Sequence, residues 1–178
     1  MGTQSATAPA AAALSYAELL NHDEQETEQW RAWFRAHPEA LDLKMELAMM
    51  HDVRGVLFHI FAVEFRYAER LQEGAETPYD DLPKGSVDEI FGIGADARKK
   101  FREFMARATE ADWNKVISFK TLSIGEFSAS KRKCFVHAVL HGMRHWAQLA
   151  TVLRQQGTKA EWHHDFMFTE AMATTWKP

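Results

Sequence analysis

The stretch Cys134-Phe-Val-His137-Ala-Val-Leu-His141-Gly-Met-Arg-His145-Trp-Ala-Gln148 decides the fold that the sequence predicts. It contains no proline, and its apolar residues fall on nearly every side of a helix. A helix that is apolar all round belongs in the interior, so we expect this one to be central. His141 and His145 are four residues apart, which places their side chains one above the other on the same helix face.

A third histidine lies in an earlier helical run, Val56-Leu-Phe-His59-Ile-Phe-Ala-Val-Glu64. His59 projects between Val56 and Val63, which are core candidates, so we expect it to point into the protein. His141 and His145 can hold one metal ion between them, and His59 from a facing helix would supply a third nitrogen. Three protein ligands leave one coordination position open, which is typical of a catalytic rather than a structural metal site.

The histidine pattern also has structural interpretations. A lone histidine on an apolar helix face is more often a buried, hydrogen-bonded side chain than a metal ligand. His137 and His141 are also four residues apart, so spacing alone does not choose between the two possible pairs. The remaining histidines are predicted to be surface or capping residues, namely His22, His37, His51, His163 and His164.

The scarcity of glycine, proline and strand signals predicts an all-α fold. The predicted helices cover residues 15–36, 43–73, 95–108 and 131–156, and the third could extend to Val116. Ser15 and Glu18 form a capping-box pattern at the start of the first helix, and Gly74 is the predicted C-terminal cap residue of the second. Four helices with one long connection between the second and third predict a four-helix bundle with a crossover. We expect a disordered tail over residues 1–13, and a single domain over 14–178. A polar connection is expected over 118–130, and the aromatic tail, including Trp162, Phe166, Phe168 and Trp176, should pack on the bundle.

The composition excludes several classes of function. A net charge of −4 argues against nucleic acid as a partner, because phosphate binding needs a clustered positive excess. The short basic runs Arg98-Lys99-Lys100 and Lys131-Arg132-Lys133 are predicted to be solvated helix termini. No apolar stretch reaches the ~18 residues that span a bilayer, so no membrane partner is expected. Cys134 is the single cysteine, which we expect to be buried in the core of a cytoplasmic protein without an intramolecular disulfide.

Two motifs resemble the DinB/YfiT-like superfamily. The run from His137 to Gly157 has His-x3-His, a Gln three residues after the second metal histidine, and a Leu-Arg-x-x-Gly ending. His59, followed by Ile-Phe-Ala-Val-Glu-Phe-Arg-Tyr, resembles the ligand motif of the family's second helix. The resemblance selects His141 and His145 over His137, and it implies a four-helix bundle, often a homodimer, with a zinc or nickel ion. Characterised members include thiol-dependent S-transferases and isomerases that use low-molecular-weight thiols such as mycothiol or bacillithiol, and many others have no known activity.

The sequence departs from the family next to the metal ligands. Members often have His-His-Arg-Gly-Gln where this chain has Arg144-His145-Trp146-Ala147-Gln148. The second metal histidine is kept, whereas the neighbouring histidine and the small glycine are not. We expect Trp146 to point away from the site, so that the ligand geometry survives.

The predicted site is suited to activating a small ligand. A divalent ion on three imidazoles lowers the pKa of a bound water or thiol, and imidazole ligands alone do not distinguish zinc from nickel. Gln148 is a candidate for a residue that binds a ligand or orients a metal ligand, and the alternative is an amide packed at a helix junction. Arg66 lies near the azimuth of His59 and is either a contact for an acidic substrate or part of a solvated face.

Two functional hypotheses follow. The first is a divalent-metal-dependent enzyme acting on a small molecule, either a thiol-dependent S-transferase or a hydrolase. The alternative is a non-catalytic metal-binding or stress-response protein, of the DNA-damage-inducible kind. The substrate, the metal and the reaction are not fixed by any motif in this chain.

Overall fold

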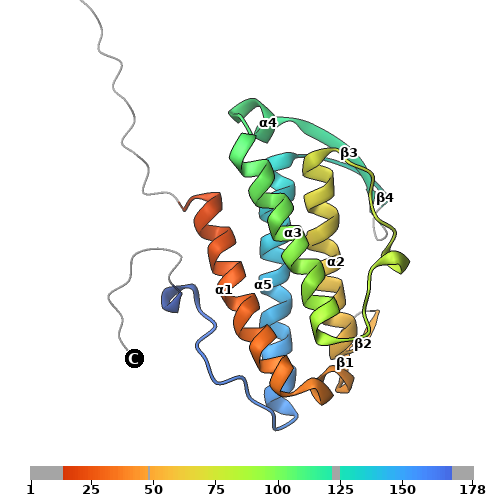
Figure 1. Ribbon diagram of the computed structural model, residues 1–178, viewed down its shortest axis with the longest axis vertical. Helices are drawn as coiled ribbons and strands as arrows, with labels where there is room; N and C mark the ends of the chain where they lie inside the picture. The colour runs from red at the N-terminus through yellow and green to blue at the C-terminus, as the bar shows by residue number, and fades with distance from the viewer. Residues whose placement is uncertain (1–13, 48, 122–124, 170–178) are drawn as a thin grey trace, which may run out of the picture.

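Four long helices lie side by side in this computed structural model, which describes residues 14–47, 49–121 and 125–169. The helices are α1 (Tyr16–Ala36), α2 (Val53–Gln72), α3 (Val87–Arg107) and α5 (Lys131–Gln155) (Figure 1). The prediction of an all-α four-helix bundle is therefore confirmed. Among the described residues, no helix is both long and apolar enough to cross a membrane.

The order of the helices explains the long crossover. Followed by colour in Figure 1, α1 runs down, α2 and α3 both run up, and α5 runs down again. Because α2 and α3 point the same way, the chain must return along the bundle between them, and residues 73–86 make this connection. It contains the short 3₁₀ helix η2 (Tyr79–Asp81), where Tyr79 packs against Phe58 of α2.

Side-chain caps set where the helices begin. The Ser15 hydroxyl accepts a hydrogen bond from the backbone N–H of Glu18, and the Glu18 carboxylate accepts one from the backbone N–H of Ser15, which confirms the predicted capping box. The Asp52 carboxylate caps α2 by accepting from the backbone N–H of Gly55. The predicted start of α2 at residue 43 is therefore wrong, and the helix begins ten residues later, at Val53.

The third and second helices also differ from prediction at their ends. Ser86 and Glu89 form a second capping box, so α3 begins at Val87 rather than at residue 95. It ends at Arg107, and the separate short helix α4 (Glu110–Asn114) follows it. At the end of α2 the left-handed residue is Glu73, with φ 58°, rather than Gly74.

Two β-hairpins were not predicted. β1 (Lys44–Leu47) pairs with β2 (Met50–Asp52), and β3 (Val116–Thr121) pairs with β4 (Gly125–Ser130), both antiparallel. The second hairpin replaces the expected polar connection over 118–130. Within β3, apolar and polar residues alternate from Ile117 to Lys120, as in a strand with one face toward the protein. Both hairpins lie at the ends of the bundle and leave its four-helix core intact (Figure 1).

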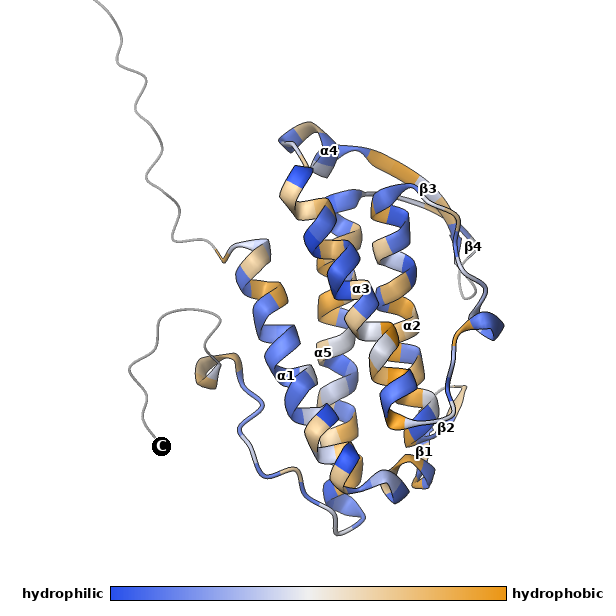
Figure 2. Ribbon diagram, viewed as in Figure 1, coloured by the Kyte–Doolittle hydropathy of each residue, from blue (hydrophilic) through white to orange (hydrophobic). Residues whose placement is uncertain are grey.

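The core of the bundle is dominated by aromatic side chains. Trp30 of α1 stacks on Trp146 of α5 with ring centroids 5.5 Å apart, and Phe61 of α2 packs on Phe91 of α3 at 4.9 Å. All four are almost completely buried. Apolar residues line the inner faces of the helices, whereas hydrophilic residues cover much of α1 and α3 (Figure 2). The expected orientation of Trp146 toward the core is confirmed.

A charged cluster lies inside this core. Arg98 of α3 is only 3% exposed, and its guanidinium lies 3.3 Å from the Glu64 carboxylate of α2 and 3.7 Å from Asp23 of α1. The predicted solvation of the run Arg98-Lys99-Lys100 is therefore wrong for Arg98. It is also wrong for Lys131, which is buried and pairs with Glu73 at 2.7 Å. In both cases a carboxylate from another helix stabilises the buried cation.

The segment after α5 packs along α1. The buried Glu26 carboxylate accepts hydrogen bonds from the indole N–H groups of Trp30 and Trp162, and it lies 2.6 Å from Nδ1 of His164. The Phe166 ring meets the buried His22 ring edge-on at 4.9 Å. The packing expected of Trp162 and Phe166 is confirmed, whereas Trp176 and the predicted 1–13 tail lie outside the described residues.

Replacing Arg98 should destabilise the fold far more than replacing an exposed arginine one turn away. Arg98→Met leaves two buried carboxylates without a counter-charge, so we expect the free energy of unfolding in urea to fall by about 3–5 kcal/mol at pH 7. Arg102→Met is the control, because its ion pair with Glu24 is at the surface and is worth at most ~1 kcal/mol. Similar losses in the two variants would contradict the importance assigned to the buried cluster.

Candidate metal site

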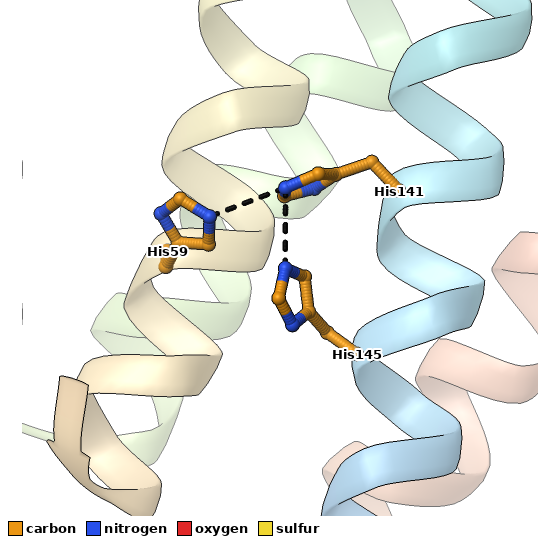
Figure 3. A group of neighbouring side chains, drawn as sticks. All are labelled: His59, His141 and His145. Atoms are coloured by element: carbon orange, nitrogen blue, oxygen red, sulfur yellow. Dashed lines mark hydrogen bonds between the residues drawn. The ribbon is translucent and has the colours of Figure 1, made fainter. Parts of the chain in front are cut away.

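Three histidines from two helices converge between α2 and α5 (Figure 3). His59 comes from α2, and His141 and His145 come from successive turns of α5. His145 is buried, whereas His59 and His141 are half-buried, so the cluster can be reached from solvent. One ligand nitrogen from each ring lies within 4.8 Å of the other two, a group that can hold a metal ion.

Two of the three distances between the ligand nitrogens match those expected for tetrahedral coordination. Nε2 of His141 lies 3.2 Å from Nε2 of His59 and 3.2 Å from Nε2 of His145. Two nitrogens bound at the usual Zn–N distance of about 2.0–2.1 Å are separated by about 3.3 Å at a tetrahedral angle. The positions of the rings around His141 therefore already match those of ligands around one zinc-sized ion.

A glutamine fixes the tautomer of one ring. The Oε1 atom of Gln148 accepts a hydrogen bond from Nδ1–H of His145 at 2.8 Å. With the proton on Nδ1, Nε2 of His145 carries a lone pair toward the cluster. This is the arrangement in which an outer side chain orients a metal-binding imidazole. The sequence singled out Gln148 for such a role, and the structure places it in contact with His145.

The electrostatic environment keeps the cluster neutral. Burial and, to a smaller extent, the neighbouring His145 and His59 rings lower the pKa of His141 to about 3. Burial likewise lowers the pKa of His145 to about 4, with a further contribution from His59. The pKa of His59 is also lowered, first by burial and then by Arg144. All three imidazoles are therefore uncharged at pH 7, so none of them has to lose a proton before it binds a cation.

His137 and Cys134 lie outside this cluster. The His137 ring is exposed and packs against Tyr67, with centroids 5.1 Å apart, and it is not among the three convergent groups. Cys134 is 1% exposed, and burial raises the pKa of its thiol to about 11. The prediction that Cys134 is a buried core residue is confirmed.

The remaining histidines have structural partners. His37 ends α1 and its Nδ1 contacts the carbonyl oxygen of Trp33 at 2.9 Å, and exposed His51 lies 3.0 Å from Glu46. His163 is exposed, as predicted. His22 was predicted to be a surface residue but is 3% exposed, because Phe166 from the C-terminal segment covers it.

The similarity of this protein to known proteins extends over nearly the whole chain and is not confined to the histidine site. The sequence pattern of the DinB family matches residues 3–177. The chain belongs to the DinB family. A DinB-like protein from Bacillus subtilis, YjoA, shares the fold in its crystal structure, with a TM-score of 0.56, 15% identity, and 81% of this chain and 92% of that chain covered. No curated protein matches the chain.

In this DinB-family chain, we predict about one divalent ion per chain at the three histidines. His141→Ala removes the nitrogen that lies next to both others, so metal should be absent from the variant after dialysis against Zn²⁺ or Ni²⁺ and elemental analysis. His137→Ala is the matched control from the previous turn of α5 and should keep full occupancy. Equal loss in the two variants, or full occupancy in His59→Ala, would reject the assignment.

Gln148→Leu tests the outer hydrogen bond. The leucine keeps the volume but cannot accept from Nδ1–H of His145, so we expect the affinity for Zn²⁺ to fall about 10–100-fold. Gln155→Leu, at an exposed position two turns further along α5, should leave the affinity unchanged. The measurement is competition with a chromogenic chelator, and equal affinities of the Gln148→Leu variant and the wild-type protein would show that this contact does not orient the ligand.

Proposed function

We propose that this protein is a divalent-metal-dependent enzyme whose site is His59, His141 and His145. The observation that carries the proposal is the convergence of three imidazoles, with Nε2 of His141 3.2 Å from Nε2 of each of the other two, at a place where two of the rings are only half-buried. A purely structural site would be expected to close the fourth position with a protein ligand. In the described part of the chain, no carboxylate or thiol joins the three histidines.

The protein's residues hold and orient the site. When bound, a divalent ion with a free position lowers the pKa of a thiol or water that ligates it. The three imidazoles are neutral, so they leave the charge of such an ion uncompensated and favour an anionic ligand. Gln148 holds the His145 ring through Nδ1, and the buried α5 residues around Gly142 fix the height of the histidines along the helix.

For the reaction, we propose thiol-dependent S-transfer to a small electrophile. The support is the neutral donor set together with the resemblance of the two histidine motifs to those of thiol-dependent enzymes. A sulfur ligand is soft and suits zinc or nickel in such a site. The competing reaction is hydrolysis, which would use the same position for water. The non-catalytic alternative keeps the ion but has no turnover.

Cobalt substitution distinguishes these functions. We expect the Co²⁺-loaded protein to develop a sulfur-to-metal charge-transfer band when a thiol such as 2-mercaptoethanol is added, and the band to be lost in His141→Ala. Its intensity should fall at low pH, because the thiol and the histidines then take up protons.

Three outcomes are separable. A band with turnover of thiol and an electrophilic acceptor supports the transferase. No spectral change with thiols, but hydrolysis of an ester or amide, overturns the transferase in favour of the hydrolase. Neither response would favour a binding protein without catalysis.

We also propose that the protein assembles as a homodimer. Large apolar side chains remain exposed on the described surface, including Val116 at 63%, Phe127 at 39% and Leu140 at 53%. Burial of such groups against a second copy would be favourable. The aromatic tail is less available for this purpose, because Trp162 and Phe166 pack on α1.

Light scattering tests the dimer. We expect a mass near twice the 20.4 kDa of one chain at micromolar concentration. Leu140→Ser should shift the equilibrium toward the monomer. A mass that stays near 20.4 kDa would refute the proposal, and the exposed apolar residues would then need no partner.

A further inference from the structure

One cation lies at the rim of the histidine cluster. Arg144 precedes His145 on α5 and is exposed, and its Nη2 atom lies 3.5 Å from Nε2 of His145. Its charge lowers the pKa of His59, His141 and His145, although burial is the larger cause for each. Arg144 is therefore close enough to act on all three rings of the cluster.

Among the described residues, Arg144 differs from most arginines of the protein in forming no ion pair, and its polar contact is with Nε2 of His145. Most of the others form ion pairs with carboxylates, including Arg66 with Glu76 at 3.0 Å. Arg107 and Arg154 form none, but they lie in the last turns of α3 and α5, where the helix dipole stabilises a cation. Within the described ranges, no carboxylate lies within 4.0 Å of Arg144, which is in the middle of α5.

The position of Arg66 excludes it from the same role. Its guanidinium lies over the Tyr79 ring, 4.5 Å from the centroid, and is paired with Glu76. The sequence offered Arg66 as a contact for an acidic substrate, but the crossover segment already occupies it. Arg144 is exposed and has further N–H donors besides the one near His145, so its guanidinium can also bind a ligand beside the cluster.

The charges at the site favour an anionic ligand. Three neutral imidazoles contribute no negative charge, so a divalent ion there would add its full charge beside the Arg144 guanidinium. A ligand whose single negative atom binds the ion would leave the Arg144 guanidinium without a counter-charge. A carboxylate matches the single charge of arginine and accepts two parallel hydrogen bonds from its planar fork.

We infer that Arg144 recognises a carboxylate on the small molecule that enters the three-histidine site. The inference rests on the proposed function, because it assigns the substrate class of that same site. The substrate is then a carboxylate-bearing small molecule, and Arg144 is a specificity-determining residue rather than a group that takes part in the reaction.

The test compares matched ligands of the cobalt-substituted protein by absorption titration. The first pair is 3-mercaptopropionate and 3-mercaptopropionamide, which differ only in the carboxylate. The second pair is butyrate and butyramide, which lack sulfur. The proteins are the wild type, Arg144→Gln, Arg144→Lys and the control Arg154→Gln, and elemental analysis verifies that each carries the same amount of cobalt.

We expect Arg144→Gln to weaken binding of 3-mercaptopropionate about tenfold or more and to change binding of the amide far less. Arg144→Lys should restore part of the loss, because lysine keeps the charge but lacks the fork. Arg154→Gln should behave as wild type. An unchanged preference for the carboxylate in Arg144→Gln would overturn the inference.

Failure of the thiol chemistry is recognised separately. If neither thiol binds any of the proteins, the proposed S-transferase falls, and the sulfur-free pair decides the role of Arg144. Weaker butyrate binding in Arg144→Gln than in the wild type then supports the inference. Butyrate binding that is absent or equal in the two proteins rejects it.

Discussion

The packing of the bundle depends on one buried ionic cluster. Arg98 of α3 lies between Glu64 of α2 and Asp23 of α1, and burial raises the pKa of Asp23 to about 6. The fourth helix meets the cluster at Gly142, where an added Cβ would lie 3.0 Å from the Glu64 carboxylate. Charges inside an apolar core tolerate little displacement, because a separated partner is left buried and uncompensated. The cluster therefore fixes the height of all four helices relative to one another.

The histidine site inherits its geometry from this constraint. Gly142 directly follows His141, and Glu64 lies little more than one turn after His59 on α2. The contact that sets Gly142 against Glu64 thus also sets the heights at which His141 and His59 face each other, with Nε2 atoms 3.2 Å apart. About 100° further round α5, Trp146 is held by stacking on Trp30, which fixes the rotation of the helix and so directs His145 toward α2. The contacts that hold the buried core together therefore also position the half-buried histidine cluster.

Patterns between residues close together in the sequence predicted much of the fold and the site, whereas contacts between residues far apart in the sequence were not predicted. The spacing of His141 and His145 and the Ser15–Glu18 capping box depend on neighbours within one turn, so they could be read directly. The β1–β2 hairpin was missed because Met49 falls at helical spacing before Val53 and Val56, although it is 90% exposed and Asp52 caps the helix after it. The burial of Arg98 could not be read, since its partner Glu64 is 34 residues away and a basic run is ordinarily solvated. That the three histidines bind a metal is still a prediction.

X-ray absorption spectroscopy of the zinc-loaded protein tests the central claim most directly. The coordination shell should contain three imidazole nitrogens at about 2.0–2.1 Å and one further light atom, from the ligand at the open position. His145→Ala should lower the imidazole contribution by one ring. In thiol-free buffer, a sulfur shell at about 2.3 Å, from Cys134 or a methionine, would contradict the account, as would zinc bound without imidazole.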